Sequence, residues 1–185
     1  MLRDLSWVKM VCPSCPSVAS PCAVKTFTAW TLRAKDDMYL LDTNMLIALC
    51  DADHEHHERV RAWFGKASSH GWATCPLTEN GLLRIMGHPA YPGGPGSPAG
   101  IRPLLQKLRT HRFHHFLPDA VTLADGYLIA DLDDVGPKGL TDVYLLALAV
   151  HNKATFATLD QKIDPRKVAG GPAAFINLLP STDGM

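Results

Sequence analysis

Residues 38–44 read Met-Tyr-Leu-Leu-Asp-Thr-Asn, and the fold of the chain is best worked out from this stretch. Tyr39–Leu41 is a short apolar run that predicts a strand, and Asp42 ends it. The residues that follow, 43–50, predict a helix. In an open parallel sheet, ligands bind beyond the carboxyl ends of the strands, so Asp42 stands at a position where chemistry is expected.

The same alternation of strand and helix continues along the chain. Further strands are predicted at residues 72–75, 114–117, 154–159 and 174–178. Helices are predicted at residues 54–67, from Pro76 onward, and at 101–110, 121–132 and 141–151, the last capped by Thr141. Strands separated by helices imply parallel pairing, so the predicted fold class is α/β, a three-layer α/β/α sandwich with a short parallel sheet.

Residues 1–37 differ from the rest of the sequence. Residues 11–24 are crowded with Pro, Ser and Cys and show neither the helical nor the strand period. Residues 1–37 are therefore expected to be a disordered or non-native N-terminal extension, and residues 38–185 to form the single domain. Cys12, Cys15 and Cys22 suggest zinc, but no fourth ligand has a suitable spacing, so we favour no metal there.

The composition narrows the classes of partner and compartment. The formal net charge is zero, so any contact with nucleic acid must rest on a local patch or on a metal. The five cysteines are an odd number, which rules out a fully paired disulfide framework within the chain and favours a reducing, cytoplasmic compartment. No apolar run approaches the length of a membrane span, so no membrane partner is expected.

Four acidic residues fall at strand-to-helix connections. Asp42 and Asp160 each follow a predicted strand, and Glu79 and Asp142 each lie in the first turn of a predicted helix. Such connections bring side chains to one edge of a parallel sheet, where four carboxylates repel one another. A divalent cation that prefers oxygen ligands offsets this repulsion, so Mg2+ or Mn2+ is the expected cofactor.

Each of these carboxylates also has a purely structural explanation. The helix dipole alone favours an acidic residue at the positions of Glu79 and Asp142. Asp42 suits the cap of the helix that follows it, and Asp160 suits a turn. These explanations weaken when taken together, because all four residues fall at the same predicted edge.

Four blocks of the sequence resemble those of a known family. The blocks are MYLLDTN (38–44), LTENGLLRI (77–85), GLTDVYLLALAV (139–150) and ATFATLD (154–160). In order and spacing they resemble the signature blocks of PIN-domain ribonucleases, in particular VapC-type toxins of bacterial toxin–antitoxin pairs. The resemblance extends from residue 38 to about residue 179.

The resemblance implies a PIN-like nuclease domain with an acidic Mg2+ or Mn2+ site. By position its catalytic and metal-binding residues match Asp42, Glu79, Asp142 and Asp160, with Asn44 and Thr141 as supporting polar residues. It also implies an RNA substrate and a small antitoxin protein as partner. The N-terminal extension and the Pro- and Gly-rich loop at residues 91–99 depart from the family pattern, and the loop is expected to alter access of the substrate.

The function expected is therefore that of a metal-dependent endoribonuclease, the toxin of a type II toxin–antitoxin system. Two alternatives stay open: a PIN-fold module that binds RNA or protein without cleavage, and an RNA-processing nuclease with no antitoxin. A homodimer is expected, because symmetric dimers are common among small domains. The basic residues of the third quarter of the chain are either a solvated helix face or an RNA-contacting rim, and those assigned to the rim are Arg102, Lys107, Arg109 and Arg112.

Two other groups of residues are set aside as sites. His54, His56 and His57 lack the spacing of a zinc-protease helix and are interpreted as surface or packing residues. Cys50 and Cys75 have apolar neighbours and are expected to be buried and inert.

Overall fold

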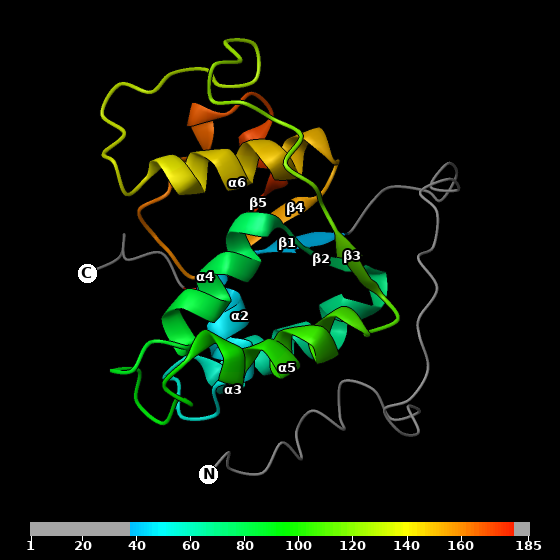
Figure 1. The fold of residues 1–185 in the computed structure, drawn as a ribbon. Coiled ribbons are helices and arrows are strands. Elements are labelled where there is room, and N and C mark those ends of the chain that lie inside the picture. The colour runs from blue at the N-terminus through cyan, green and yellow to red at the C-terminus, as the bar shows by residue number, and fades with distance from the viewer. Residues whose placement is uncertain (1–37, 180–185) are drawn as a thin grey trace, which may run out of the picture.

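The computed structural model describes residues 38–179, which form a five-stranded parallel sheet flanked by helices (Figure 1). The strands lie in the order β3-β2-β1-β4-β5, and every neighbouring pair is parallel. Their bounds are β1 Tyr39–Leu41, β2 Trp72–Thr74, β3 His114–Phe116, β4 Thr155–Thr158 and β5 Phe175–Asn177. The predicted α/β class and parallel sheet are confirmed.

Helices cover both faces of the sheet and make three layers. Figure 1 shows α2, α3, α4 and α5 on one face and α6 on the other. The bounds of these helices are α2 Thr43–Cys50, α3 His57–Ala67, α4 Pro76–Met86, α5 Pro98–Arg109 and α6 Leu140–His151. Residues 38–179 also contain three short 3-10 helices: η2 Ser68–His70, η3 Pro165–Lys167 and η4 Gly171–Ala174.

Strand β1 lies at the centre of the sheet and supplies both cores. Leu41 packs with the apolar residues of α2, α3, α4 and α5, whereas Leu40 packs with those of α6. Both side chains are completely buried. This follows from the period of a strand, whose successive side chains point to opposite faces. The apolar run before Asp42 therefore fixes the aspartate at the end of the central strand.

Residues 121–132 are not a helix, and this prediction was wrong. The segment consists of turns with a single bridge between Ile129 and Val168, and it belongs to a long irregular connection from β3 to α6. Its apolar residues pack on the α6 side of the sheet without a helical backbone. Turn-forming residues explain the difference: Asp125 accepts hydrogen bonds from the backbone N–H groups of Tyr127 and Leu128, which competes with helix formation.

Thr141 does not cap α6, which corrects a second prediction. The cap position is Gly139, with no side-chain cap, and Thr141 lies exposed within the first turn. Other boundaries move by a few residues: α3 begins three residues later than predicted, and α5 begins three residues earlier because the Ser97 side chain accepts a hydrogen bond from the Gly100 N–H.

The expectations for residues 1–37, including those for Cys12, Cys15 and Cys22, fall outside the described residues. Cys50 and Cys75 are buried free thiols, as predicted, and burial raises the pKa of Cys50 to about 12. No helix within residues 38–179 is both long and apolar enough to span a membrane.

Candidate active site

Asp42 is held at the carboxyl end of β1 by two hydrogen bonds. Its Oδ1 accepts from the backbone N–H of Thr43 at 2.6 Å, so it caps α2, and its Oδ2 accepts from the hydroxyl of Thr158 at 2.7 Å. The residue is 6% exposed. The prediction that Asp42 caps the following helix is therefore correct. Its carboxylate can still take a further ligand, because each oxygen retains a second acceptor site.

Thr158, at the end of β4, connects three of the polar residues of this edge. Besides donating to Asp42, its hydroxyl accepts from the Asn44 side-chain amide at 3.1 Å and from the backbone N–H of Asp160 at 3.0 Å. The Asn44 side-chain oxygen in turn accepts from the N–H of Leu159 at 3.2 Å. The interpretation of Asn44 as a supporting residue agrees with this network, whereas Thr158 was missed. Its place directly before Leu159-Asp160, at the carboxyl end of a predicted strand, was the available signal.

Asp142 lies in the first turn of α6 and shares an electrostatic environment with Asp42 and Asp160. Burial and, after it, the negative charges of Asp42 and Asp160 together raise the pKa of Asp142 to about 7. Burial also raises the pKa of Asp42, against the hydrogen bonds from Thr158 and Thr43 that lower it, and the charge of Asp160 adds to the rise. The structure therefore brings these three carboxylates within mutual influence.

Glu79 belongs to a neighbouring network. Its Oε1 accepts from the hydroxyl of Thr74 at 2.7 Å, and its Oε2 forms an ion pair with Arg109 Nη1 at 3.0 Å. The Thr74 oxygen is also 2.8 Å from His114 Nε2. Because the Thr74 hydroxyl donates to Glu79, His114 Nε2 is the donor in the second bond. Glu79 thus carries its own cation and is not among the charges that raise the pKa of Asp142.

Helix α2, which Asp42 caps, and helix α4, which carries Glu79, approach each other closely at Gly81. A Cβ atom placed on Gly81 would lie 2.5 Å from Oγ1 and 2.7 Å from Cγ2 of Thr43. Thr43 is the residue directly after Asp42, and Gly81 lies half a turn after Glu79 on α4. The absence of a side chain at Gly81 therefore allows α2 and α4 to bring the two acidic networks side by side.

The chemistry of the aspartates fits a divalent cation of the Mg2+ type. Within residues 38–179, no three His, Cys, Asp or Glu side chains lie close enough together to ligate one metal ion. Burial and, after it, the negative charges of Asp42 and Asp160 disfavour the ionised form of Asp142, and a bound cation would offset both effects. Carboxylate oxygens are the donors that Mg2+ and Mn2+ prefer, so Asp42, Asp142 and Asp160 carry donors of the right chemical type, although their side chains would have to move closer together to share one ion.

The basic residues assigned to an RNA-contacting rim differ in their surroundings. Arg102 and Lys107 are exposed on α5, as a solvated helix face would be. Arg109 pairs with Glu79 and lies over the ring of Phe116, with 4.5 Å between Cζ and the ring centroid. Arg112 lies over Phe113 in the same way at 4.2 Å. Of the four, Arg109 is the one that contacts an acidic residue of the candidate site.

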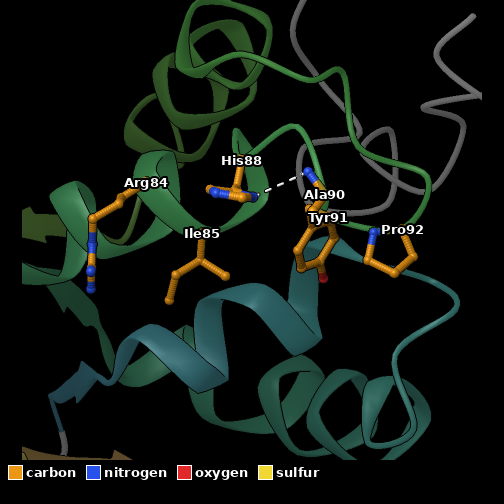
Figure 2. A pocket seen from close by; sticks show the side chains of 6 residues that line it. All are labelled: Arg84, Ile85, His88, Ala90, Tyr91 and Pro92. Atoms are coloured by element: carbon orange, nitrogen blue, oxygen red, sulfur yellow. Dashed lines mark hydrogen bonds between the residues drawn. The ribbon is translucent and has the colours of Figure 1, made fainter.

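The Pro- and Gly-rich loop lines a separate hollow of about 350 Å³ (Figure 2). Its walls come from the end of α4 and the start of the loop: Arg84, Ile85, His88, Ala90, Tyr91 and Pro92. Tyr91 is fixed by a 2.7 Å hydrogen bond from its hydroxyl to Asp51 Oδ2. None of the six lining residues is acidic, so this hollow is distinct from the aspartate network.

The histidine triplet plays a packing role in part. His57 is buried at the start of α3, and its Nδ1 lies 2.8 Å from the carbonyl oxygen of Ala48. His54 Nδ1 accepts from the backbone N–H of His56 at 3.1 Å. These contacts explain the residues within the turn between α2 and α3, away from the carboxyl ends of the strands.

The sequence of the chain was compared with those of known proteins and protein families. Residues 39–169 match the PIN domain. The chain is 43% identical over 131 residues to Ribonuclease VapC44 of Mycobacterium tuberculosis, a stretch that covers 71% of this chain and 92% of that protein. It is 40% identical over 127 residues to Ribonuclease VapC38 of the same organism, covering 66% and 85%, and 38% identical over 121 residues to its Ribonuclease VapC29, covering 65% and 84%.

Proposed function

The chain belongs to the PIN domain family, and on that premise we propose that it is a Mg2+- or Mn2+-dependent endoribonuclease of the VapC type, the toxin of a toxin–antitoxin pair. The similarity extends over nearly the whole length of relatives that are named ribonucleases. The structural observation that carries the proposal is the network at the carboxyl ends of β1 and β4, in which Thr158 donates to Asp42 and accepts from the Asp160 N–H. Asp142 lies near enough for the charges of both aspartates to raise its pKa.

The proposed roles follow from what surrounds each carboxylate. Asp42 and Asp142 are the direct metal ligands, because burial and repulsion make their charged forms costly without a cation. Asp160 and Glu79 complete the ligand set or orient the attacking water. Thr158 and Asn44 hold Asp42 and the start of the β4–η3 connection in register.

The bound metal would supply Lewis-acid polarisation of the scissile phosphate and a lowered pKa for an attacking water. The chain's own residues would do the rest. Asp42 is fixed by two hydrogen bonds before any ligand arrives, so this carboxylate is already oriented in the free protein. Glu79, held by Thr74 and Arg109, is fixed in the same sense.

The antitoxin proposal is supported by two exposed apolar side chains of α4. Leu77, near the start of the helix, is 41% exposed, and Ile85, near its end, is 36% exposed. Ile85 also lines the hollow of Figure 2, between Arg84 and His88. We assign these two side chains to the binding of a flexible antitoxin segment with apolar side chains and an acidic residue near Arg84.

An arginine of the same segment would enter the aspartate network, where its guanidinium can bridge two carboxylates. Antitoxin and metal then compete for the same oxygens, so the affinity of the antitoxin should fall as free Mn2+ rises. A homodimer and a cytoplasmic location are part of the same proposal, and light scattering of the purified protein tests the first of these.

The experiment that tests the proposed function is cleavage of RNA by the purified full-length chain. Cleavage is expected with Mg2+ or Mn2+ and is lost with EDTA, and cleavage of circular RNA distinguishes an endonuclease from an exonuclease. If RNA binds but stays intact in every metal, the chain is a binding module instead. If it cleaves but no neighbouring gene encodes an inhibitor, it is an RNA-processing nuclease.

A further inference from the structure

We propose that Phe116 and Arg109 form a stacking site for one base of a single-stranded RNA, next to Glu79. This inference rests on the proposed function, because it names a contact of the same substrate. Phe116 ends the edge strand β3 and is 37% exposed, one of the few large apolar side chains that remain so exposed among the described residues.

The position of Phe116 is fixed by the register of the sheet. Phe116 pairs with Thr74 of β2, and the Leu117 N–H donates to the Thr74 carbonyl at 2.9 Å. The Thr74 hydroxyl donates to Glu79. The aromatic ring therefore lies at the same edge of the sheet as Glu79, one strand away, where the carboxyl ends of the strands gather the site's polar residues.

Arg109 connects the Phe116 ring to Glu79. Its guanidinium lies over the Phe116 ring and also forms the 3.0 Å ion pair with Glu79 Oε2. A guanidinium carries five N–H donors, so Arg109 can hold Glu79 through Nη1 and present other donors to an RNA phosphate. Its side chain is 44% exposed, which leaves it accessible to a ligand.

The chemistry of the pair selects a nucleobase rather than another apolar group. Proteins that bind single-stranded nucleic acid combine an aromatic ring, on which a base stacks, with a cation that neutralises the adjoining phosphate. Phe116 and Arg109 provide both within one contact, and arginine adds a planar surface of its own. The formal charge of the chain is zero, so a local contact of this kind is what RNA binding requires.

The test compares two labelled single strands of equal length by fluorescence anisotropy, using the full chain with Asp142→Asn to prevent cleavage. One strand is a random-sequence RNA pool, and the other is an abasic ribose-phosphate strand with the same charge. Phe116→Leu should weaken binding to the RNA by about 5- to 100-fold and leave binding to the abasic strand unchanged. Arg109→Gln should weaken both, because it removes a phosphate contact.

Two further variants separate stacking from folding. Phe116→Trp retains an aromatic ring and should retain the preference for RNA over the abasic strand. Tyr127→Leu removes a ring that is 96% exposed in the β3–α6 connection and should change neither affinity. The inference is overturned if Phe116→Leu, folded by circular dichroism, binds both strands as the parent does, or if the parent itself does not prefer RNA. When the wild-type chain nevertheless cleaves RNA, only the inference fails, and when it neither cleaves nor binds RNA, the proposed function fails with it.

Discussion

The hydroxyl of Thr158 donates a 2.7 Å hydrogen bond to Oδ2 of Asp42, although the two residues are 116 positions apart in the sequence. Thr158 is completely buried and Asp42 nearly so. The bond joins the carboxyl ends of the adjacent parallel strands β1 and β4, which pair with Leu41 opposite Ala157. It thereby ties the aspartate at the end of the central strand to the segment that carries Asp160.

Replacing Thr158 by valine should damage both stability and activity. The substitution keeps the shape but removes a hydroxyl that serves Asp42, Asn44 and the Asp160 N–H. Leaving such buried groups unsatisfied costs about 1–3 kcal/mol, and RNA cleavage should fall by about tenfold or more because Asp42 loses one of its two anchors. Urea unfolding and initial cleavage rates measure the two effects. Thr158→Ser, which keeps the hydroxyl, should cleave nearly as the wild type does, and equal damage by both variants would contradict this role.

The stability of the metal-free protein should fall as the pH rises. The pKa of Asp142 is about 7 in the folded chain against an ordinary value of 3.8, so the folded state binds its proton more tightly than the unfolded state does. This contribution is most favourable at low pH, is lost as the pH rises from about 4 to 7, and stays lost above 7. Thermal unfolding in EDTA at pH 5.5 and 8.0 measures the change.

Asp142→Asn isolates this group from the other titrating residues. At pH 8.0 the variant should be more stable than the wild type, and the gap should narrow at pH 5.5 by on the order of 1 kcal/mol, reduced because the side chain is only partly buried. Saturating Mn2+ should stabilise the wild type and thereby reduce the difference in stability between Asp142→Asn and the wild type. A gap that does not vary with pH would show that the carboxylate is not crowded in the free protein.

Gly81→Ala should destabilise the protein and reduce cleavage, although alanine ordinarily stabilises a helix interior relative to glycine. The new methyl group would lie within 2.7 Å of the Thr43 side chain and push α4 from α2. A loss of about 1–3 kcal/mol is expected from overpacking. Gly65→Ala in α3 is the matched control, because a Cβ there meets nothing within 4 Å, and it should stabilise the chain by up to about 1 kcal/mol. If both variants stabilise the chain, the close approach at Gly81 is not a constraint.

A chain that begins at Met38 should fold and cleave RNA like the full chain. The family match starts at residue 39, and Met38 already packs in the core on the α6 side of the sheet. Circular dichroism, thermal unfolding and cleavage rates compare the two proteins. Aggregation or loss of activity would assign residues 1–37 to the domain.

The parts of the fold that the sequence predicted are those with a strong local pattern. The run before Asp42 and the TDVYLLALA segment are largely buried, so their apolar character identified a strand and the helix α6, although not the central place of that strand in the sheet. The prediction for residues 121–132 was wrong because Val121, Leu128 and Ile129 are spaced by seven and eight residues, as on one face of a helix, yet they pack from an irregular backbone. Side chains such as Asp125 stabilise turns there by accepting hydrogen bonds from the backbone, which competes with helix formation. The spacing of apolar residues carries no information about this competition.

The positions of the acidic residues could be predicted from the sequence, whereas the contacts that hold them in place could not. Asp42, Asp142 and Asp160 stand at strand and helix ends, which the sequence marks. The ion pair between Glu79 and Arg109 depends on how α5 packs against α4, and no local pattern encodes it. The same holds for the hydroxyl of Thr158, since threonine at the end of a strand is ordinary until its partner across the sheet is known.

Cleavage of RNA by Asp142→Asn, compared with wild type and Asp133→Asn, tests the central claim most directly. Asp133 is an exposed aspartate in the β3–α6 connection and controls for loss of a negative charge elsewhere. With Mg2+ or Mn2+ present, wild type and Asp133→Asn should cleave alike, and Asp142→Asn should lose about 100-fold or more of the rate while remaining folded. Cleavage by purified, folded Asp142→Asn at the wild-type rate would contradict the account.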